Sequence, residues 1–529
     1  MADAIDDQVG VFLPFDAAFP EKSPDIYLLR SLLQQLNKTE MIMNCSLLNL
    51  IVTDHLLEGQ GTGPERHLRK QWQLVTALFP PSALPRIADF INQHPNFSII
   101  FRGQLIELIR WAALFGQDGE SSDEMVTDLK KREIFCKALL IASNLWAERV
   151  YRNKMRSDGD LTARRLELLS RCRRSISETG KGPDLTQAFV RGRALIYEGI
   201  CKLDPKFSES FNSKTGLKVD EYYCCLLLIV LRSLGIDVDP GTERIFARRT
   251  FNPLDTVTKE MPLLLSRFMA RCSQSAAELT AQLWGEKTMP SQTDFETFDH
   301  RVLLLRPVFR IRKDLAIVMD PVWLAEIMAT GPLFEATNVE DALRNFGEVF
   351  ESHCLARLER MYATGSGLTR RLWCVPKGHA RGKGEVELAD AILDCVDRTA
   401  FIETKAVWMR EDKIEGPSKD YIAFLRSKYG AAVSGKDCKR KGVAQLAGSI
   451  RDFALGNRKP EDKDLQIWSM IVPVLLVYDS LIDAPLHPWF LAREFALLLD
   501  PLNVDWRGES IRVGHNLVTS LTGCGKMAE

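Results

Sequence analysis

Hydrophobic residues recur at helical spacing through most of the first 295 residues. Leu28, Leu32 and Leu36 lie about one helical turn apart, and similar stripes follow. The predicted helices cover 25–50, 97–115, 133–155 and 161–176. Proline pairs, glycine runs and polar clusters separate them, and the alternation typical of strands is scarce. The pattern therefore predicts an α-helical region over residues 1–295, in one or two subdomains.

The pattern changes after a polar, proline-containing stretch at 285–298, which reads as a linker. Three short strands are predicted, at Val302–Leu305, Val308–Ile311 and Leu315–Met319, and a helix from Pro321 that ends near Gly331. Residues 338–362 predict a longer helix. Its apolar stripe consists of Phe346, Phe350, Cys354, Leu358 and Met361. Glu351 lies next to this stripe, where it can face the edge of a core.

A β-hairpin is predicted at 385–409. Val386, Leu388, Asp390 and Ile392 alternate with their neighbours on the first strand, and Thr399–Val407 returns across a turn. A helix at 442–453 follows. Ile467–Tyr478 is then rich in Val and Ile and predicts a buried strand that is broken or lies at a sheet edge at Pro473. Residues 296–529 are therefore expected to form a second domain, with a mixed sheet flanked by helices.

Composition narrows the class of protein. The chain has 529 residues, of which 46% are hydrophobic and 26% are charged, which is typical of a globular protein with more than one core. The 12 cysteines show no C-x-x-C pair, which argues against a zinc ribbon and favours reduced thiols. No leader or membrane-length apolar run is visible, so a soluble, cytoplasmic protein without a membrane partner is expected.

The net charge of −1 gives no overall attraction to nucleic acid, so any such binding must come from local patches. Between Lys130 and Arg174 there are 13 Lys and Arg residues against five acids. A second basic cluster follows the hairpin. The residues proposed to contact phosphate are Arg171, Arg173, Arg174, Lys439, Arg440 and Lys441. The alternative is that these charges form solvated surfaces with salt bridges to acidic neighbours.

The hairpin offers the clearest candidate chemistry. Glu403 and Lys405 are two residues apart on one strand and therefore share a face with Phe401. Charges embedded in an apolar strand are costly unless they are paired or bind an ion. Mg²⁺ prefers oxygen ligands, which Asp390, Glu403 and the backbone carbonyl of Thr404 can supply. Lys405 would then orient the attacking water and offset phosphate charge.

With these residues in order, the stretch 300–500 resembles the PD-(D/E)xK nuclease superfamily. Asp390 matches the first acid of its motif, and Glu403-Thr404-Lys405 matches the second part. Glu351 matches an additional acid on a preceding helix, and Gln445 a glutamine on the following one. Ala389 departs from the proline of the family motif.

The resemblance implies an α + α/β architecture, with a helical N-terminal region followed by a restriction-endonuclease-like mixed-sheet domain. It implies a catalytic set of Asp390, Glu403, Lys405, Glu351 and Gln445, with the first two and Glu351 as metal ligands. The cofactor would be Mg²⁺, for which Mn²⁺ can substitute, and the activity hydrolysis of phosphodiester bonds. The resemblance does not distinguish DNA from RNA or endonuclease from exonuclease activity; a DNA endonuclease is the leading expectation. Large proteins of this layout resemble bacterial anti-phage defence effectors, which is an analogy of context.

Two alternatives stay open at this point. The chain could be a catalytically inactive nuclease-fold subunit that binds nucleic acid or scaffolds a multiprotein defence complex. It could also be a helical interaction protein in which the Glu-x-Lys triplet is coincidental, because this short pattern alone is weak. A protein partner, or a second copy of the chain, would bind through residues 1–295.

Overall fold

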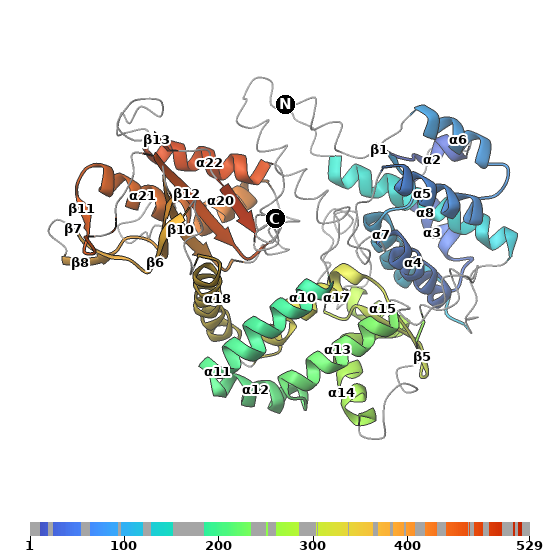
Figure 1. Cartoon of the computed structure of the whole chain (residues 1–529). Coiled ribbons are helices and arrows are strands. Elements are labelled where there is room, and N and C mark those ends of the chain that lie inside the picture. The colour runs from blue at the N-terminus through green and yellow to red at the C-terminus, as the bar shows by residue number, and fades with distance from the viewer. Residues whose placement is uncertain are drawn as a thin grey trace. The chain divides into compact units, whose positions relative to one another are not determined.

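The protein, described by a computed structural model, has two compact units (Figure 1). The first holds the described residues up to Val339 and the second those from Glu340 onward. The described residues are 11–19, 25–53, 64–93, 97–119, 128–151, 185–233, 250–251, 261–284, 303, 305–336, 338–362, 369–380, 384–395, 398–407, 418–430, 441–463, 465, 470–479, 486–499, 512–513 and 517–520.

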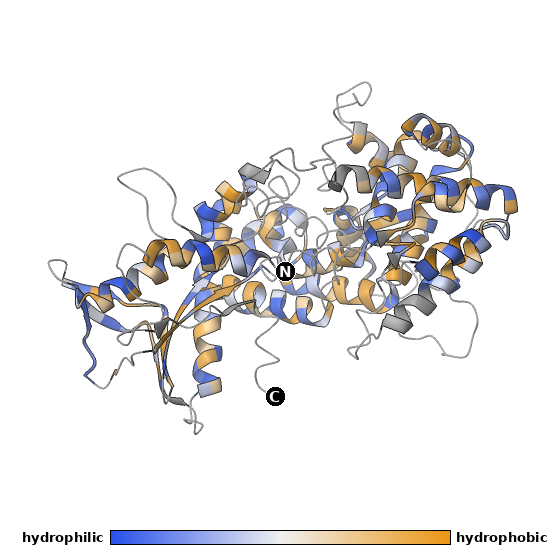
Figure 2. Cartoon of the chain, turned by 90° about the horizontal axis from the view of Figure 1, so that it is seen from above, coloured by the Kyte–Doolittle hydropathy of each residue, from blue (hydrophilic) through white to orange (hydrophobic). Residues whose placement is uncertain are grey.

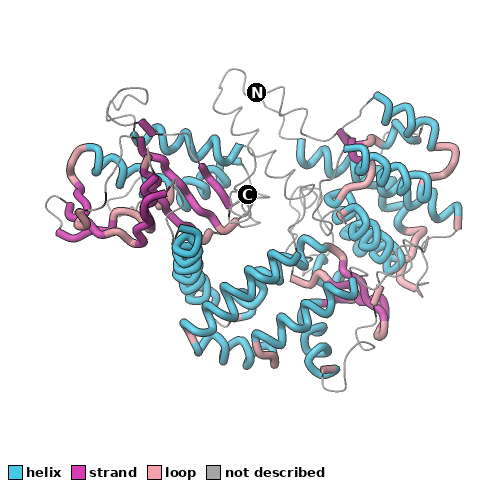
Figure 3. The backbone as a smooth tube through the Cα atoms, viewed as in Figure 1, coloured by secondary structure: helices cyan, strands magenta, loops and turns pink. Residues whose placement is uncertain are grey.

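The first unit is built mainly of helices, as its hydrophobic pattern predicts (Figure 3). Its helices are α2 (Phe15–Ala18), α3 (Ile26–Leu33), α4 (Lys38–Val52), α5 (Pro64–Leu78), α6 (Leu84–Gln93), α7 (Arg102–Phe115), α8 (Leu129–Tyr151), α10 (Leu185–Gly192), the π-helix η2 (Arg193–Ile200), α11 (Cys201–Leu203), α12 (Pro205–Thr215), α13 (Val219–Ser233), α14 (Pro262–Cys272), α15 (Ala276–Trp284) and α17 (Pro321–Glu335). Its strands are β1 (Val11–Phe12), β2 (Phe97–Ser98), β3 (Ser273–Gln274), β4 (Val308–Arg312) and β5 (Leu315–Val318).

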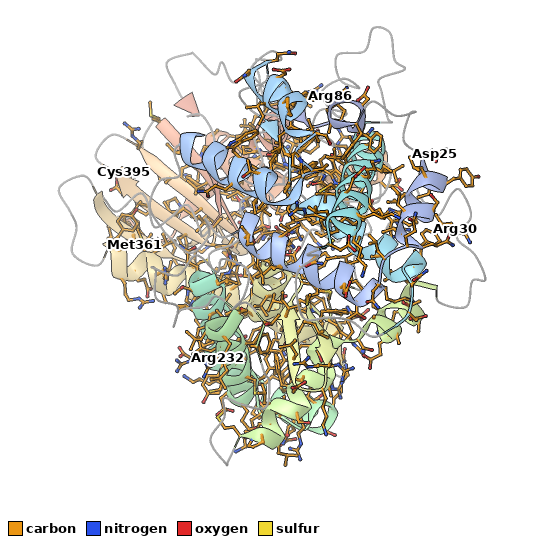
Figure 4. All side chains as sticks on the ribbon, turned by 90° about the vertical axis from the view of Figure 1, so that its right-hand side faces the viewer. Asp25, Arg30, Arg86, Arg232, Met361 and Cys395 are labelled. Carbon is orange, nitrogen blue, oxygen red and sulfur yellow. The ribbon has the colours of Figure 1, made fainter. Side chains whose placement is uncertain are left out.

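The helix predicted over 25–50 is two helices, because two polar residues each begin one. The Asp25 carboxylate, labelled in Figure 4, accepts a hydrogen bond from the Leu28 amide at 2.7 Å and begins α3. Asn37 accepts bonds from the amides of Thr39 and Glu40 and begins α4. The capping side chains outweigh the continuous leucine spacing that suggested one helix. The helix predicted at 161–176 lies outside the described residues.

The boundary between the units was predicted too early in the chain. Strands β4 and β5 and helix α17 belong to the first unit rather than to the sheet-containing unit. The Asn49 side chain of α4 donates to the Met319 carbonyl at 2.9 Å, and Arg102 of α7 pairs with Asp320 at 2.6 Å. These contacts join the β-hairpin and the start of α17 to the helices of the first unit.

Two local predictions in this stretch are also corrected. Helix α17 does not end at Gly331 but continues through Pro332 to Glu335, packed against α10 and α13. A Cβ atom at Gly331 would lie 2.5 Å from the Tyr222 hydroxyl, so this glycine allows close helix packing. The strand predicted at Val302–Leu305 is not found at Leu303, which is helical, and 301–302 and 304 lie outside the described residues.

The ion pair of Arg102 and Asp320 is almost fully buried, with 6% and 0% of the side chains exposed. Asp320 also caps α17 by accepting bonds from the amides of Val322 and Trp323. We predict that Arg102→Ala lowers the free energy of unfolding by about 3–5 kcal/mol, because it leaves a buried carboxylate without its cation. Denaturant titration measures this. Arg312→Ala, which breaks an exposed pair with Asp314, is the control and should change it by less than about 1 kcal/mol.

The second unit combines a mixed sheet with helices. In chain order its elements are α18 (Val339–Tyr362), β6 (Thr369–Cys374), β7 (Lys377–Ala380), β8 (Gly384–Glu387), β9 (Ala391–Cys395), β10 (Thr399–Lys405), α20 (Ser418–Tyr429), α21 (Val443–Ala454), β11 (Arg458–Pro460), β12 (Met470–Val477), α22 (Leu486–Leu499), β13 (Arg512–Val513) and β14 (Leu517–Ser520). The helix predicted at 338–362 is confirmed as α18.

The larger sheet has the order β13-β12-β10-β9-β6, with β14 also paired to β12. Strand β9 is antiparallel to both of its neighbours, β6 and β10, whereas β10 and β12 are parallel. The central strands are coloured mainly as hydrophobic in Figure 2, as expected for strands covered by helices. Phe453 of α21 packs on Phe401 of β10, with ring centroids 6.1 Å apart, so α21 covers that face.

The predicted hairpin is correct for β9 and β10 but not for its first residues. Strand β8 is separate from β9 and pairs instead with β7, in a three-stranded sheet of order β11-β7-β8. The chain leaves the small sheet after Glu387 and enters the large one at Ala391. Asp390 therefore lies at the crossing between two sheets rather than inside a strand.

Strand β12 is not broken at Pro473, and it is not an edge strand. Strand β13 pairs with Met470 and Ile471, and β14 pairs from Val474 onward. The Tyr478 amide donates a hydrogen bond to the Lys405 carbonyl of β10. Backbone groups of successive strand residues point to opposite sides, so those of Pro473, five residues earlier, point away from β10. Neither β13 nor β14 pairs with Pro473, so its missing N–H removes no ladder bond.

Candidate active site

The register of β9 and β10 brings the first acid of the motif to the second. The ladder pairs Ile402 with Ala391, and its continuation sets Asp390 opposite Glu403. Sequence alternation alone placed Glu403 and Lys405 on one face. The end of the ladder brings Asp390 close enough to Glu403 for its charge to raise the pKa of that carboxyl.

The Asp390 carboxylate is held by Thr404. Its Oδ2 atom accepts a hydrogen bond from the Thr404 amide at 2.6 Å and from the Thr404 hydroxyl at 2.7 Å. The carboxylate takes the place of the next carbonyl in the β9–β10 ladder, because β9 begins only at Ala391. Only 4% of Asp390 is exposed, so these bonds hold its orientation in a site that is largely closed to water.

The direction of the Thr404 carbonyl follows from the same ladder. The Lys405 carbonyl accepts a hydrogen bond from the Tyr478 amide, on the side of β12. The backbone groups of the preceding residue, Thr404, therefore point to the opposite side, toward β9. The N–H and C=O groups of one strand residue point the same way. The Thr404 carbonyl therefore points to the side from which Asp390 approaches, as a metal ligand there would need to.

Glu403 is buried, with 1% of its side chain exposed, and Lys405 Nζ lies 2.5 Å from its Oε1. Burial raises the pKa of Glu403 to about 8 against the lowering effect of Lys405, and Asp390 and Glu387 raise it further. A buried strand has no structural need for such a carboxylate, since an apolar residue would fill the position without desolvating a charge.

Two further carboxylates belong to this cluster. Burial raises the pKa of Glu351 on α18, and the charges of Asp390 and Glu387 raise it further. Burial also raises the pKa of Glu387, and both the charge of Asp390 and a hydrogen bond with Asp390 raise it further. The charges of Asp390 and Lys405 both act on Glu351, Glu387 and Glu403, so these side chains lie close enough to influence one another. Such a concentration of carboxylates favours a bound cation.

Glu387 is the residue that sequence reasoning missed. It lies three residues before Asp390, and in one continuous strand this spacing would put the two side chains on opposite faces. The crossing from β8 to β9 removes that restriction. The only signal in the sequence was a second acid close to the motif.

Gln445 lies in the first turn of α21, half-buried, on the helix that covers the Phe401 face. Within the described part of the chain, no hydrogen bond joins its side chain to the four acids. Of the predicted phosphate-contacting residues, only Lys441 is described, and it is exposed just before α21. Arg171, Arg173, Arg174, Lys439 and Arg440 lie outside the described residues.

The oxygen donors of this cluster are of the kind that a hard divalent cation binds. Among the described residues, no group of three or more His, Cys, Asp or Glu side chains is arranged so that it could hold a metal ion. A magnesium site does not require one, since one or two carboxylates with waters and substrate phosphate suffice. Asp390, Glu403 and the Thr404 carbonyl would hold such an ion, and Glu351 lies near enough for its charge to act on Asp390.

We predict that divalent cation binding strengthens as pH rises toward 8. The cation binds the ionised carboxylate, whereas Glu403 with a pKa of about 8 is mainly protonated at lower pH. Each pH unit below 8 should weaken the apparent affinity by up to about tenfold, with about one proton released per ion bound. Calorimetry with Mn²⁺ in buffers of different ionisation enthalpy measures both. Affinity independent of pH between 6 and 8 would contradict the prediction.

Comparison with known proteins identifies no relative. No protein-family model matches the chain, no curated protein matches it, and no solved structure resembles it significantly. Within the described residues, the helices are all too short or too polar to cross a membrane.

Proposed function

We propose that the second unit is a metal-dependent nuclease that hydrolyses phosphodiester bonds. The observation that carries the proposal is the ion pair of buried Glu403 and half-buried Lys405 beside Asp390, with Thr404 bonded to the Asp390 carboxylate. This is the acid, acid and lysine set of the PD-(D/E)xK resemblance. Its residues come from β10 and the start of β9, beside the acid-bearing helix α18.

The order of elements supports the same proposal. Helix α18, the antiparallel strands β9 and β10, helix α21 and the parallel strand β12 follow the order of the family core, with Glu351 and Gln445 on the two helices. The first unit would bind nucleic acid, a partner or a second copy of the chain. DNA is the preferred substrate in this proposal, with cleavage inside the strand and a role in bacterial defence.

The roles of the residues follow from their chemistry. When bound, Mg²⁺ would act as a Lewis acid toward the phosphate and lower the pKa of the attacking water. Asp390 and Glu403 hold the cation, and Thr404 keeps the Asp390 carboxylate oriented. Lys405, with 22% of its side chain exposed, can turn its ammonium group to the water or to a phosphate oxygen while staying close to Glu403.

The test is incubation of the full chain with single- and double-stranded DNA and RNA, in Mg²⁺, Mn²⁺ or EDTA. We expect cleavage of DNA that needs the cation and stops in EDTA. Glu385→Gln is the matched control, because Glu385 is an exposed acid on β8 that pairs with Lys377. Cleavage by the parent and the control, but not by Asp390→Asn, supports the proposal. Mn²⁺ binding by the parent without cleavage of any substrate would favour an inactive nuclease-fold subunit.

A further inference from the structure

We infer that the corner at Val375 and Pro376 is a positioning element for the candidate catalytic Asp390, an inference that rests on the proposed function. Val375 has a φ angle of 46°, and no other non-glycine residue in the described ranges has a positive φ. Two features disfavour this conformation: the Val375 side chain is branched at Cβ, and the next residue is a proline. Such a conformation persists only where the surrounding structure imposes it.

Packing of the side chain does not account for valine at this position. Val375 is 40% exposed, so burial contributes little to holding it there. The contacts that fix the corner are made by the backbone. The Val375 amide donates to the Asp390 carbonyl at 2.8 Å, and the Leu388 amide donates to the Pro376 carbonyl at 2.9 Å.

These two bonds lie where the chain crosses between sheets twice. Residues 375–376 lead from β6 to β7, and residues 388–390 lead back from β8 to β9. The ladders on either side end at the pairs of Cys374 with Ala391 and of Lys377 with Glu387. The two hydrogen bonds of Val375 and Pro376 therefore link the segment 375–376 to the segment 388–390 next to Asp390.

Close packing of Leu388 against β7 also restricts movement of residues 388–390. A Cβ atom at Gly378 would lie 2.7 Å from Leu388 Cδ2 and 2.5 Å from the Lys459 carbonyl. Leu388 itself is 1% exposed, held beneath β7. The Asp390 main chain is thus fixed from the Val375 side and its carboxylate from the Thr404 side. Val375 reaches the carboxylate only through the Asp390 backbone, which makes it a positioning residue.

The test separates backbone restriction from side-chain identity with three variants. Val375→Gly accepts the positive φ but frees the corner, Val375→Ala keeps the restriction, and Val375→Asn favours the left-handed region. We expect about tenfold weaker Mn²⁺ binding and slower cleavage for Val375→Gly alone, since residues that orient metal ligands have effects of this size. Its thermal midpoint should equal or exceed that of the parent, because strain is relieved.

Hydrogen exchange gives a readout that does not depend on activity. Amides of 399–405 should exchange faster in Val375→Gly than in the parent, Val375→Ala or Val375→Asn, since Asp390 holds the Thr404 amide less firmly. Equal effects in all three variants, or none in Val375→Gly, would overturn the positioning role. A parent that neither binds Mn²⁺ nor cleaves nucleic acid would overturn the proposed function instead, and the exchange rates would then decide the positioning role alone.

Discussion

Replacing Glu403 with glutamine will abolish metal-dependent cleavage, with a loss of about a thousandfold or more. The change keeps the size of the side chain and an oxygen that can accept from Lys405, but removes the charge that binds the cation. Mn²⁺ affinity measured by calorimetry should fall together with the cleavage rate, and saturating Mg²⁺ should not restore the rate. A glutamine variant that cuts like the parent would place the chemistry elsewhere.

The same substitution should stabilise the metal-free protein at alkaline pH. The pKa of Glu403 is about 8 in the folded state, above its ordinary value of 4.5, so the folded state holds a proton that the unfolded chain releases. Parental stability therefore falls as pH rises from about 4.5 to 8. The uncharged glutamine has no such dependence.

We expect the free energy of unfolding of Glu403→Gln to be about 4 kcal/mol higher than that of the parent at pH 8 and nearly equal to it at pH 4. Denaturant titrations of the metal-free proteins at the two pH values measure this difference. Glu385→Gln provides the control, since its carboxylate is exposed on β8 and paired with Lys377. A glutamine variant less stable than the parent at pH 8 would show that Glu403 has a structural role.

Replacing Lys405 with methionine will separate cleavage from metal binding. The ammonium group lies 2.5 Å from Glu403, and its charge also lowers the pKa of Glu351 and Glu387. Its loss should lower the cleavage rate by about a hundredfold to ten-thousandfold, as expected for a group that positions water or offsets developing charge. Mn²⁺ affinity should stay equal to that of the parent or increase, because the site becomes more negative.

Lys377→Met is the matched control for this variant. Lys377 is an exposed lysine that pairs with Glu385 at 2.5 Å, so it reproduces the loss of a Glu–Lys pair outside the cluster. Its cleavage rate and Mn²⁺ affinity should match those of the parent. Parallel loss of cation binding and cleavage in Lys405→Met would mean that Lys405 maintains the site rather than acting on the substrate.

Prediction from the sequence succeeded where local patterns decide the structure. The apolar stripe from Phe346 to Leu358 predicted α18, and alternation predicted the β9–β10 pair. It failed where short-range polar contacts or long-range packing override a pattern. Asn37 begins a new helix inside a leucine-rich run, and α17 continues past Gly331 because α10 and α13 pack against it.

The sequence by itself determined that Glu403 and Lys405 share one face of an apolar strand, because side chains alternate along β10. Only the tertiary structure decided which groups meet them there. Register with β9 brings Asp390 opposite Glu403, and the crossing between two sheets adds Glu387. The Val375 corner likewise reaches Asp390 only after β6, β7, β8 and β9 have paired. Strand pairing and burial depend on contacts between distant segments, which local periodicity does not encode.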